Sequence, residues 1–408
     1  MNEGLLNKIG LIKVLIPGYI ALTIFTIGEG IDKGWISSFF ISKGFNPTEI
    51  GVIIGFYGLI TGIAGWLSGI LTDMWKGPRK VMLFGVISWL IFQILFLTLG
   101  YNGNIHLLIL TYGLRAMGYP LFVFAFITWI AYEAPEDKMG SSMGWFWFWH
   151  TLGYVALSGY IAGWLKNTLT DYQIFLFCVP WIIVGGIIAI ITASKEIKVE
   201  KSPTFREALG VIKYDYRTAI IAIVRLINTA GLLYALPIFM PLWITTVIGF
   251  SMSEWLFVWS TMFLSNTICN LFWGFIGDRI GWRNTVLWFG GVGSAICMLL
   301  YYLIPIVFGH NFYPFLIIGI LSGALLAAYT PLSAIAGTII PTKKGSVMGL
   351  LNLGGSMSYF VGGILGGLIY NYLGATGVAI VFSLFYLIGA GLTYFLPNGP
   401  IVKKLSIH

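Results

Sequence analysis

The chain alternates long apolar segments with short polar junctions along its whole length. Each apolar run holds about 20 residues, which lets a helix cross the roughly 30 Å hydrocarbon core of a bilayer at about 1.5 Å per residue. The pattern predicts twelve membrane-spanning helices, over residues 12–40, 49–71, 79–100, 106–131, 143–165, 174–193, 218–247, 253–273, 284–308, 313–339, 347–371 and 376–396. We therefore expect an all-α polytopic membrane protein whose first and seventh spans are long enough to tilt or break.

Composition agrees with this class, because 58% of the residues are hydrophobic and only 9% are charged. The chain does not begin with a short apolar core followed by a small-residue cleavage site, so the first segment is expected to be a retained span. The three cysteines fall within predicted spans and have neither metal-site nor disulfide-framework spacing. We expect no metal and no cofactor.

The formal net charge of +8 is distributed by position along the chain. Basic residues gather before the first span, after every even-numbered span and at the C-terminal end: Lys8 and Lys13; Lys76, Arg79 and Lys80; Lys138; Lys195, Lys198, Lys201, Arg206, Lys213 and Arg217; Arg279 and Arg283; Lys343 and Lys344; Lys403 and Lys404. The odd-numbered junctions hold only Lys43 and Lys166. The positive-inside rule therefore places both termini in the cytoplasm of a cell whose inner or plasma membrane holds the protein. The charge reflects topology, and no nucleic-acid partner is expected.

Three short blocks recur at a shift of 205 residues. The pairs are Gly44–Glu49 with Gly249–Glu254, Gly69 and Asp73 with Gly274 and Asp278, and Gly140–Gly144 with Gly345–Gly349. Six spans repeated in one orientation predict two bundles that rock about a site near the membrane midplane. We expect an N-terminal bundle over residues 1–193, a cytoplasmic linker over 194–217 and a C-terminal bundle over 218–408. One chain then holds a complete carrier, so we expect a monomer.

The second-half block Gly274–Arg283 resembles the cytoplasmic loop motif G-x-x-x-D-R-x-G-x-R of the major facilitator superfamily. Its first-half counterpart, residues 69–80, is looser, with Met74 in place of the usual basic residue. The resemblance implies the two-bundle fold and a gate in which a helix-end carboxylate accepts from the N–H groups of a neighbouring helix. The expected gating residues are Asp73, Arg79, Asp278, Arg279 and Arg283. An ordinary solvated turn is the alternative for each copy.

A narrower resemblance connects the intramembrane polar residues with the ribitol and D-arabinitol permeases of this superfamily. The blocks that carry it are Gly28–Asp32, Tyr112–Arg115, Tyr119–Phe122, Gly144–Trp147, Val224–Thr229, Ser253–Leu256, Asn270–Gly274 and Gly309–Phe312. This resemblance implies proton-linked import of a polyol. The chain departs from the family pattern in the first span, where Glu29 precedes Asp32 instead of an aspartate preceding a glutamate.

The two acids of the first span predict proton coupling on their own. Glu29 and Asp32 are three residues apart, so on a helix they share a face, and two close carboxylates cannot both ionise cheaply in a low dielectric. Arg115, in the fourth span, cannot lose its proton and needs one of these acids as a partner. Proton binding to that acid would release Arg115. A static ion pair that holds the first span to the fourth is the alternative.

Polar and aromatic side chains within the spans are the candidate substrate ligands, because a polyol needs hydrogen-bonding partners and flat faces against its C–H surface. The candidates are Glu29, Asp32, Arg115, Tyr119, Trp147, His150, Asn228, Asn266 and Asn352. For the asparagines, bridging between helices is an equal alternative. Arg225 either contacts the substrate or reaches the membrane interface by snorkelling.

These patterns predict a secondary transporter for the proton-coupled import of a small polyol, a pentitol such as ribitol or D-arabinitol. The alternatives are a proton-coupled sugar or organic-acid permease and a proton-antiport exporter. The four histidines are scattered and no nucleotide-binding G-x-x-x-x-G-K-S/T occurs. We therefore expect no enzyme, and partners limited to the solute, protons and the lipid bilayer.

Overall fold

The computed structural model describes residues 9–33, 35–45, 47–166, 168–197 and 204–399. Every regular element in these ranges is helical, which confirms the predicted all-α fold. Both ends of the chain lie outside the described ranges. Five residues of the basic junctions lie outside them as well: Lys8, Lys198, Lys201, Lys403 and Lys404.

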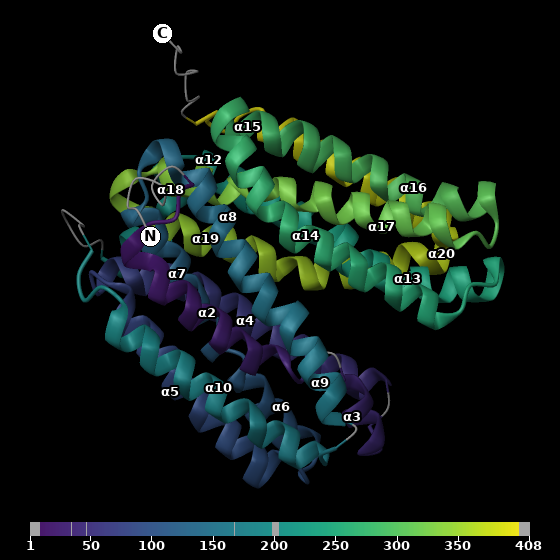
Figure 1. The fold of residues 1–408 in the computed structure, drawn as a ribbon, viewed down its shortest axis with the longest axis horizontal. Coiled ribbons are helices and arrows are strands. Elements are labelled where there is room, and N and C mark those ends of the chain that lie inside the picture. The colour runs from purple at the N-terminus through teal and green to yellow at the C-terminus, as the bar shows by residue number, and fades with distance from the viewer. Residues whose placement is uncertain (1–8, 34, 46, 167, 198–203, 400–408) are drawn as a thin grey trace.

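The helices form two groups that follow the two halves of the sequence (Figure 1). The first half contains α2 (Ile16–Gly30), α3 (Ile36–Ser42), α4 (Pro47–Met74), α5 (Pro78–Leu95), α6 (Ile105–Arg115), α7 (Gly118–Glu133), α8 (Met139–Thr151), α9 (Ser158–Lys166) and α10 (Asp171–Thr192). After the short linker helix α11 (Phe205–Leu209), the second half contains α12 (Arg217–Thr229), α13 (Leu236–Trp243), α14 (Met252–Ile280), α15 (Trp282–Asn284), α16 (Gly293–Phe308), α17 (Phe312–Leu326), α18 (Pro331–Ile339), α19 (Lys344–Phe360) and α20 (Gly366–Thr393).

Several predicted spans are built from broken helices. Of the described helical stretches, seven are long and apolar enough to cross a membrane by themselves. The last of these, Pro341–Thr393, contains the eleventh predicted span and most of the twelfth, and the backbone leaves helical geometry at Gly374 between them. The first span divides into α2 and α3, and the seventh divides into α12 and α13 around a wider π-helical turn at Ala230–Ala235. Both breaks occur in the spans whose length predicted them.

The most extensive contacts between the two groups of helices are those of α4 with α19 and of α8 with α14. At the first crossing the backbones are in contact, because a Cβ atom placed on Gly69 would lie 1.9 Å from the carbonyl oxygen of Gly345. At the second crossing, a Cβ on Gly274 would lie 2.8 Å from the carbonyl oxygen of Gly140. Small residues permit this close approach between membrane helices, so both crossings are built on the repeated blocks.

Candidate transport site and gate

Asp73, near the end of α4, is held by the N-terminus of α19 in the opposite half. Its carboxylate accepts from the backbone N–H of Gly345 at 3.0 Å and from that of Ser346 at 2.8 Å. The Ser346 hydroxyl also donates to it, at 2.9 Å, and the Tyr132 hydroxyl donates at 2.8 Å. The free N–H groups and the dipole at a helix N-terminus both favour such an anion.

Asp278, near the end of α14, makes the same contacts with the N-terminus of α8. It accepts from the backbone N–H groups of Gly140 at 2.9 Å and Ser141 at 2.8 Å, and from the Ser141 hydroxyl. The Trp282 indole donates to it at 2.9 Å. The repeat therefore produces two matching ties between the halves, at the end of the molecule where α4 and α14 finish.

The arginines of the two loop motifs take no part in these ties. Arg279 is exposed, Arg79 is partly exposed, and Arg283 donates to the Tyr394 carbonyl at 3.4 Å within its own half. In the described ranges, no ion pair joins an arginine to Asp73 or Asp278. Backbone N–H groups, hydroxyl groups and the Trp282 indole are the donors that hold the two carboxylates.

Asp32 lies in the turn after α2 and pairs with Arg115 at the end of α6. Arg115 is fully buried and also donates to the Gln93 side-chain oxygen at 2.6 Å. Gln93 in turn donates to the Phe175 carbonyl at 2.8 Å, which extends the network to α10. Arg115 thus has a first-span carboxylate as its partner, the pairing that the sequence predicts.

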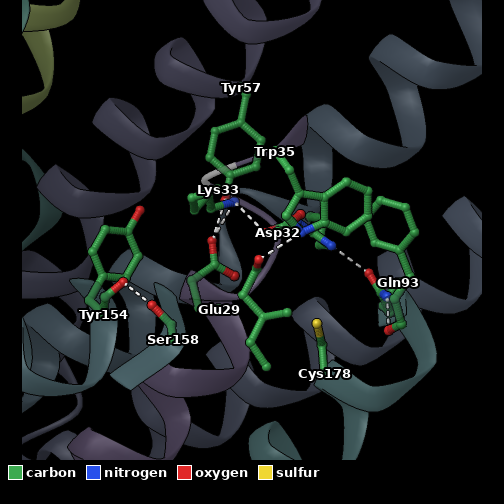
Figure 2. A network of polar contacts seen from close by, with 12 residues as sticks. Glu29, Asp32, Lys33, Trp35, Tyr57, Gln93, Tyr154, Ser158 and Cys178 are labelled. Carbon is green, nitrogen blue, oxygen red and sulfur yellow. Dashed lines mark hydrogen bonds and ion pairs between the residues drawn. The ribbon is translucent and has the colours of Figure 1, made fainter. Parts of the chain in front are cut away.

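Glu29, near the end of α2, has its own set of partners (Figure 2). One carboxylate oxygen accepts from the Tyr57 hydroxyl at 2.5 Å and pairs with the Lys33 ammonium at 2.8 Å. The other oxygen accepts from the Trp89 indole at 2.6 Å. Lys33 also donates to the Tyr57 hydroxyl at 2.8 Å and lies 3.5 Å from Asp32.

This charge network, which we define as Glu29, Asp32, Lys33 and Arg115, lies entirely within the first half. Glu29 and Asp32 are each 1% exposed. Removing isolated charges from water costs several kcal/mol per ion, which opposite charges at hydrogen-bonding distance can offset. Two carboxylates and two cations balance each other here.

A cavity of about 320 Å³ lies between the two halves. Its polar lining includes Tyr57, Thr61, Tyr119, Trp147, His150, Tyr154, Arg225, Asn228, Asn266, Asn270, Tyr329, Thr330, Asn352 and Tyr359. Six of the predicted ligands are therefore brought together: Tyr119, Trp147, His150, Asn228, Asn266 and Asn352. Glu29, Asp32 and Arg115 are not among the lining residues, since they lie within the first half behind Tyr57.

The first-half wall of the cavity is aromatic. The Tyr119 hydroxyl is 2.7 Å from His150 Nε2, and the Trp147 indole donates to the Ser333 hydroxyl at 3.2 Å. The Arg225 guanidinium reaches this wall from α12, with its central carbon 4.9 Å from the centre of the Trp147 ring. Among the described residues that line the cavity, none is acidic. The described lining therefore carries the cation of Arg225 and no carboxylate.

The amides of α14 are largely occupied by their own half. Asn266 donates to the Gly323 carbonyl at 3.3 Å, Asn270 donates to Asn266 at 3.2 Å, and the Thr330 hydroxyl donates to Asn270 at 2.7 Å. This arrangement corresponds to the helix-bridging alternative for these asparagines.

Other polar atoms of the lining are buried without a hydrogen-bond partner among the described residues: His150 Nδ1, Asn228 Oδ1, the Tyr329 hydroxyl and Asn352 Nδ2. Buried polar atoms are nearly always satisfied in folded proteins. These four atoms come from α8, α12, the turn before α18, and α19, so both halves present them. They are the positions where a polar solute or ordered water has hydrogen bonds to make.

The sequence did not identify Tyr57, Trp89, Tyr329 or Lys33 as residues of the site. Tyrosine and tryptophan are so common in this chain that nothing in the sequence separates a hydrogen-bond donor from a packing residue. Charge balance was a usable signal for Lys33, since two buried acids and one arginine leave one carboxylate uncompensated.

Two helical halves, a cavity between them and matched ties at one end are the arrangement of a membrane transport protein. Residues 18–266 and 229–406 match the family model described as Major Facilitator Superfamily. The chain belongs to this superfamily, and it is a transporter and not an enzyme.

Individual relatives are similar over nearly the whole length. An alpha-ketoglutarate permease of Bacillus subtilis (strain 168) is 34% identical over 400 residues, which cover 96% of this chain and 91% of the relative. A ribitol transporter of Klebsiella pneumoniae is 32% identical over 393 residues, covering 93% and 91%. The crystal structure of a bacterial homologue of the iron transporter ferroportin has a TM-score of 0.73 at 12% identity, covering 94% of this chain and 99% of that one, and shows a shared fold alone.

Proposed function

We propose that this protein imports a small carboxylate together with protons by alternating access. The observation that carries the proposal is the chemistry of the cavity, where Arg225 is present and no described lining residue is acidic. A guanidinium in a site of low dielectric forms charge-assisted hydrogen bonds with a carboxylate, and these are stronger than neutral ones. The similarity to an alpha-ketoglutarate permease supports the same solute class.

A polyol is the second candidate, and it is the solute that the sequence favours. The asparagines and tyrosines of the cavity are suited to hydroxyl groups. The aromatic wall formed by Tyr119, Trp147 and His150 is suited to a C–H surface. The similarity to a ribitol transporter supports this candidate.

The charge network of the first half is the proposed proton site, and the cavity is the proposed solute site. We assign the ties at Asp73 and Asp278 to a closed gate. The basic junctions lie at that end of the helices, so the gate is proposed to face the cytoplasm. The protein is proposed to lie in the inner or plasma membrane. The bundles are proposed to extend over 1–193 and 218–408, and a single chain is proposed to be the working unit.

Transport by the purified full chain in proteoliposomes tests the solute class. Labelled alpha-ketoglutarate and labelled ribitol are offered separately, with and without an imposed inward proton gradient. The proposal expects gradient-driven accumulation of alpha-ketoglutarate. Accumulation of ribitol alone would establish the polyol candidate, and accumulation of neither would overturn proton-coupled import of both.

Arg225→Gln sharpens the test. A charge-assisted hydrogen bond contributes about 1.5–3 kcal/mol, so its loss should weaken apparent affinity for alpha-ketoglutarate by about 10- to 100-fold. Transport of ribitol should change little. The matched control is Arg217→Gln, because Arg217 pairs with Asp215 at 2.5 Å outside the cavity. An equal loss in both variants would remove Arg225 from the solute site.

A further inference from the structure

Tyr57 belongs both to the wall of the cavity and to the hydrogen bonds of Glu29. We infer that Tyr57 carries the protonation state of Glu29 into the cavity, so that a solute with acceptor atoms binds more tightly when Glu29 holds a proton. The inference rests on the proposed proton-coupled transport and adds the residue that connects its two sites. It applies to a carboxylate and to a polyol, since the oxygens of both accept hydrogen bonds.

The first step of the argument concerns which acid takes up a proton. Asp32 is paired with Arg115, which is fully buried, held by Gln93, and unable to deprotonate. The cation beside Glu29 is Lys33, whose side chain is 21% exposed while that of Glu29 is fully buried. A flexible ammonium can move away from its partner when the charge of that partner is lost. The geometry therefore favours Glu29 as the proton acceptor.

The second step concerns which oxygen of Glu29 takes the proton. The Trp89 indole donates to Oε2 at 2.6 Å, and an indole N–H can only donate. A proton on Oε2 would point at that donor hydrogen. Oε1 faces the Tyr57 hydroxyl at 2.5 Å, and a hydroxyl can accept as well as donate. Oε1 also pairs with the Lys33 ammonium at 2.8 Å, but that flexible side chain can move away once the Glu29 charge is lost. Trp89 thus directs the proton to Oε1.

The third step concerns the single hydrogen of the Tyr57 hydroxyl. While Glu29 is ionised, Tyr57 donates that hydrogen to Oε1 and accepts from Lys33 at 2.8 Å. Both of these bonds point into the charge network. When Oε1 carries a proton, it donates to the Tyr57 oxygen, and the phenolic hydrogen must turn elsewhere. Because Tyr57 lines the cavity, the hydrogen becomes available to a solute there. Tyr57 stays neutral throughout, and the only proton gained is the one on Glu29.

Binding of the proton and the solute is then mutually favourable, because coupling between two sites is reciprocal. A carrier that binds proton and solute cooperatively favours their movement together. The other titratable or charged groups that face Glu29 from the surrounding helices are Asp32, Lys33, Arg115, Tyr119, Tyr154 and Cys178. Tyrosines and cysteines ordinarily hold their protons near neutral pH. Glu29 is the member of this group that changes state in the mechanism.

The test measures solute affinity as a function of pH in the purified full chain. Alpha-ketoglutarate and ribitol are the probes, and the pH runs from mildly acidic to mildly alkaline. The wild-type affinity for the accepted probe should tighten as pH falls, by up to about tenfold per pH unit, the limit for one coupled proton. Tyr57→Phe should weaken binding and remove this pH dependence. Tyr119→Phe is the matched control, because its hydroxyl contacts His150 in the same cavity, so binding should weaken while the pH dependence remains.

Two further variants protect the test against a misfolded Tyr57→Phe protein. Glu29→Gln imitates the protonated acid and should bind tightly at every pH. Trp89→Phe frees Oε2 for the proton and should reduce the pH dependence. Full pH dependence in Tyr57→Phe, or in Trp89→Phe if the first variant does not fold, would overturn the inference and leave the proposed transport standing. Wild-type protein that binds a probe with no pH dependence would overturn both.

Discussion

The two halves of this protein share a frame and differ in their interiors. At the proposed gate, Asp73 in the first half and Asp278 in the second accept from the same kinds of donors, at distances that agree to within 0.1 Å for the backbone N–H groups. Inside the halves the correspondence ends. The same 205-residue shift takes Tyr57, Trp89, Gln93 and Arg115 to Met262, Ser294, Met298 and Ile320. Arg115 and three residues that contact the charge network therefore have no copy at these positions.

From this difference we assign conformational movement to the contacts that the two halves share, and proton coupling to the interior of the first half. Two rocking bundles need matching contacts at their ends, and duplication supplies them. A proton site needs buried charge, which is costly in a membrane and must be balanced wherever it occurs. Among the described residues, the proposed proton site in the first half carries this cost, while the second half contributes the amides of α14 and the guanidinium of α12 to the cavity. Substitutions in the interior of the first half and at the contacts between the halves test this comparison.

The largest effect is expected from breaking the buried pair in the first half. Arg115→Gln leaves Asp32 charged and buried without its partner, which should destabilise the protein by about 3–5 kcal/mol. Thermal unfolding of the detergent-purified protein measures the loss. The double variant Asp32→Asn, Arg115→Gln should recover most of it. If the double variant is no more stable than Arg115→Gln, the pairing does not explain the burial.

Glu29→Gln should separate coupling from movement. The variant cannot bind and release the proton, so uphill accumulation should be lost while exchange of labelled solute across the membrane continues. Glu133→Gln is the control, because Glu133 also accepts from an indole, that of Trp129 at 3.1 Å, but is exposed at the end of α7. Accumulation should be normal in that variant. Undiminished accumulation in Glu29→Gln would remove Glu29 from the proton pathway.

Asp73→Asn and Asp278→Asn test the shared frame. Replacing a charge-assisted acceptor by a neutral one should weaken each tie by about 1–2 kcal/mol, and because the contacts match, the two variants should behave alike. Turnover is expected to fall by about tenfold with the same solute preference. A change in which solute is preferred would contradict the assignment of these residues to the gate.

The smallest effect is expected from an exposed charge pair. Lys166 and Asp171 lie 2.6 Å apart, with side chains 37% and 28% exposed. Exposed pairs contribute about 0–1 kcal/mol, so Asp171→Asn should leave thermal unfolding and transport almost unchanged. A loss as large as that of Arg115→Gln would show that burial is not what distinguishes the two pairs.

Much of the frame could be predicted from the sequence, because it rests on periodicity and repetition. Apolar length predicts the spans, and the repeated blocks at Gly69, Asp73 and Gly140–Gly144 become the crossings and ties between the halves. The partner of Arg115 was also predictable, since an arginine within a membrane needs an acid and the first span offers two.

The interior contacts could not be predicted in the same way. Glu29 and Asp32 are close in sequence, yet α2 ends at Gly30, so the two carboxylates turn to different partners. Tyr57 reaches Glu29 because α4 passes beside the end of α2, and no local sequence pattern encodes that packing. From the sequence, Arg225 could either contact the solute or reach the membrane interface by snorkelling. In the structure its guanidinium lies over the Trp147 ring across the cavity.

The neutral total of Glu29, Asp32, Lys33 and Arg115 has an electrical consequence. Under the proposed coupling, an empty carrier would move this group with no net charge, whereas a carrier with a proton on Glu29 would move one positive charge plus the charge of its cargo. Membrane voltage acts with about 2.3 kcal/mol per charge at 100 mV. With one proton, a negative interior would therefore pull a polyol inward, leave a monoanion unaffected and oppose a dianion. The direction of the transport current, or its absence, would therefore identify the charge of the cargo.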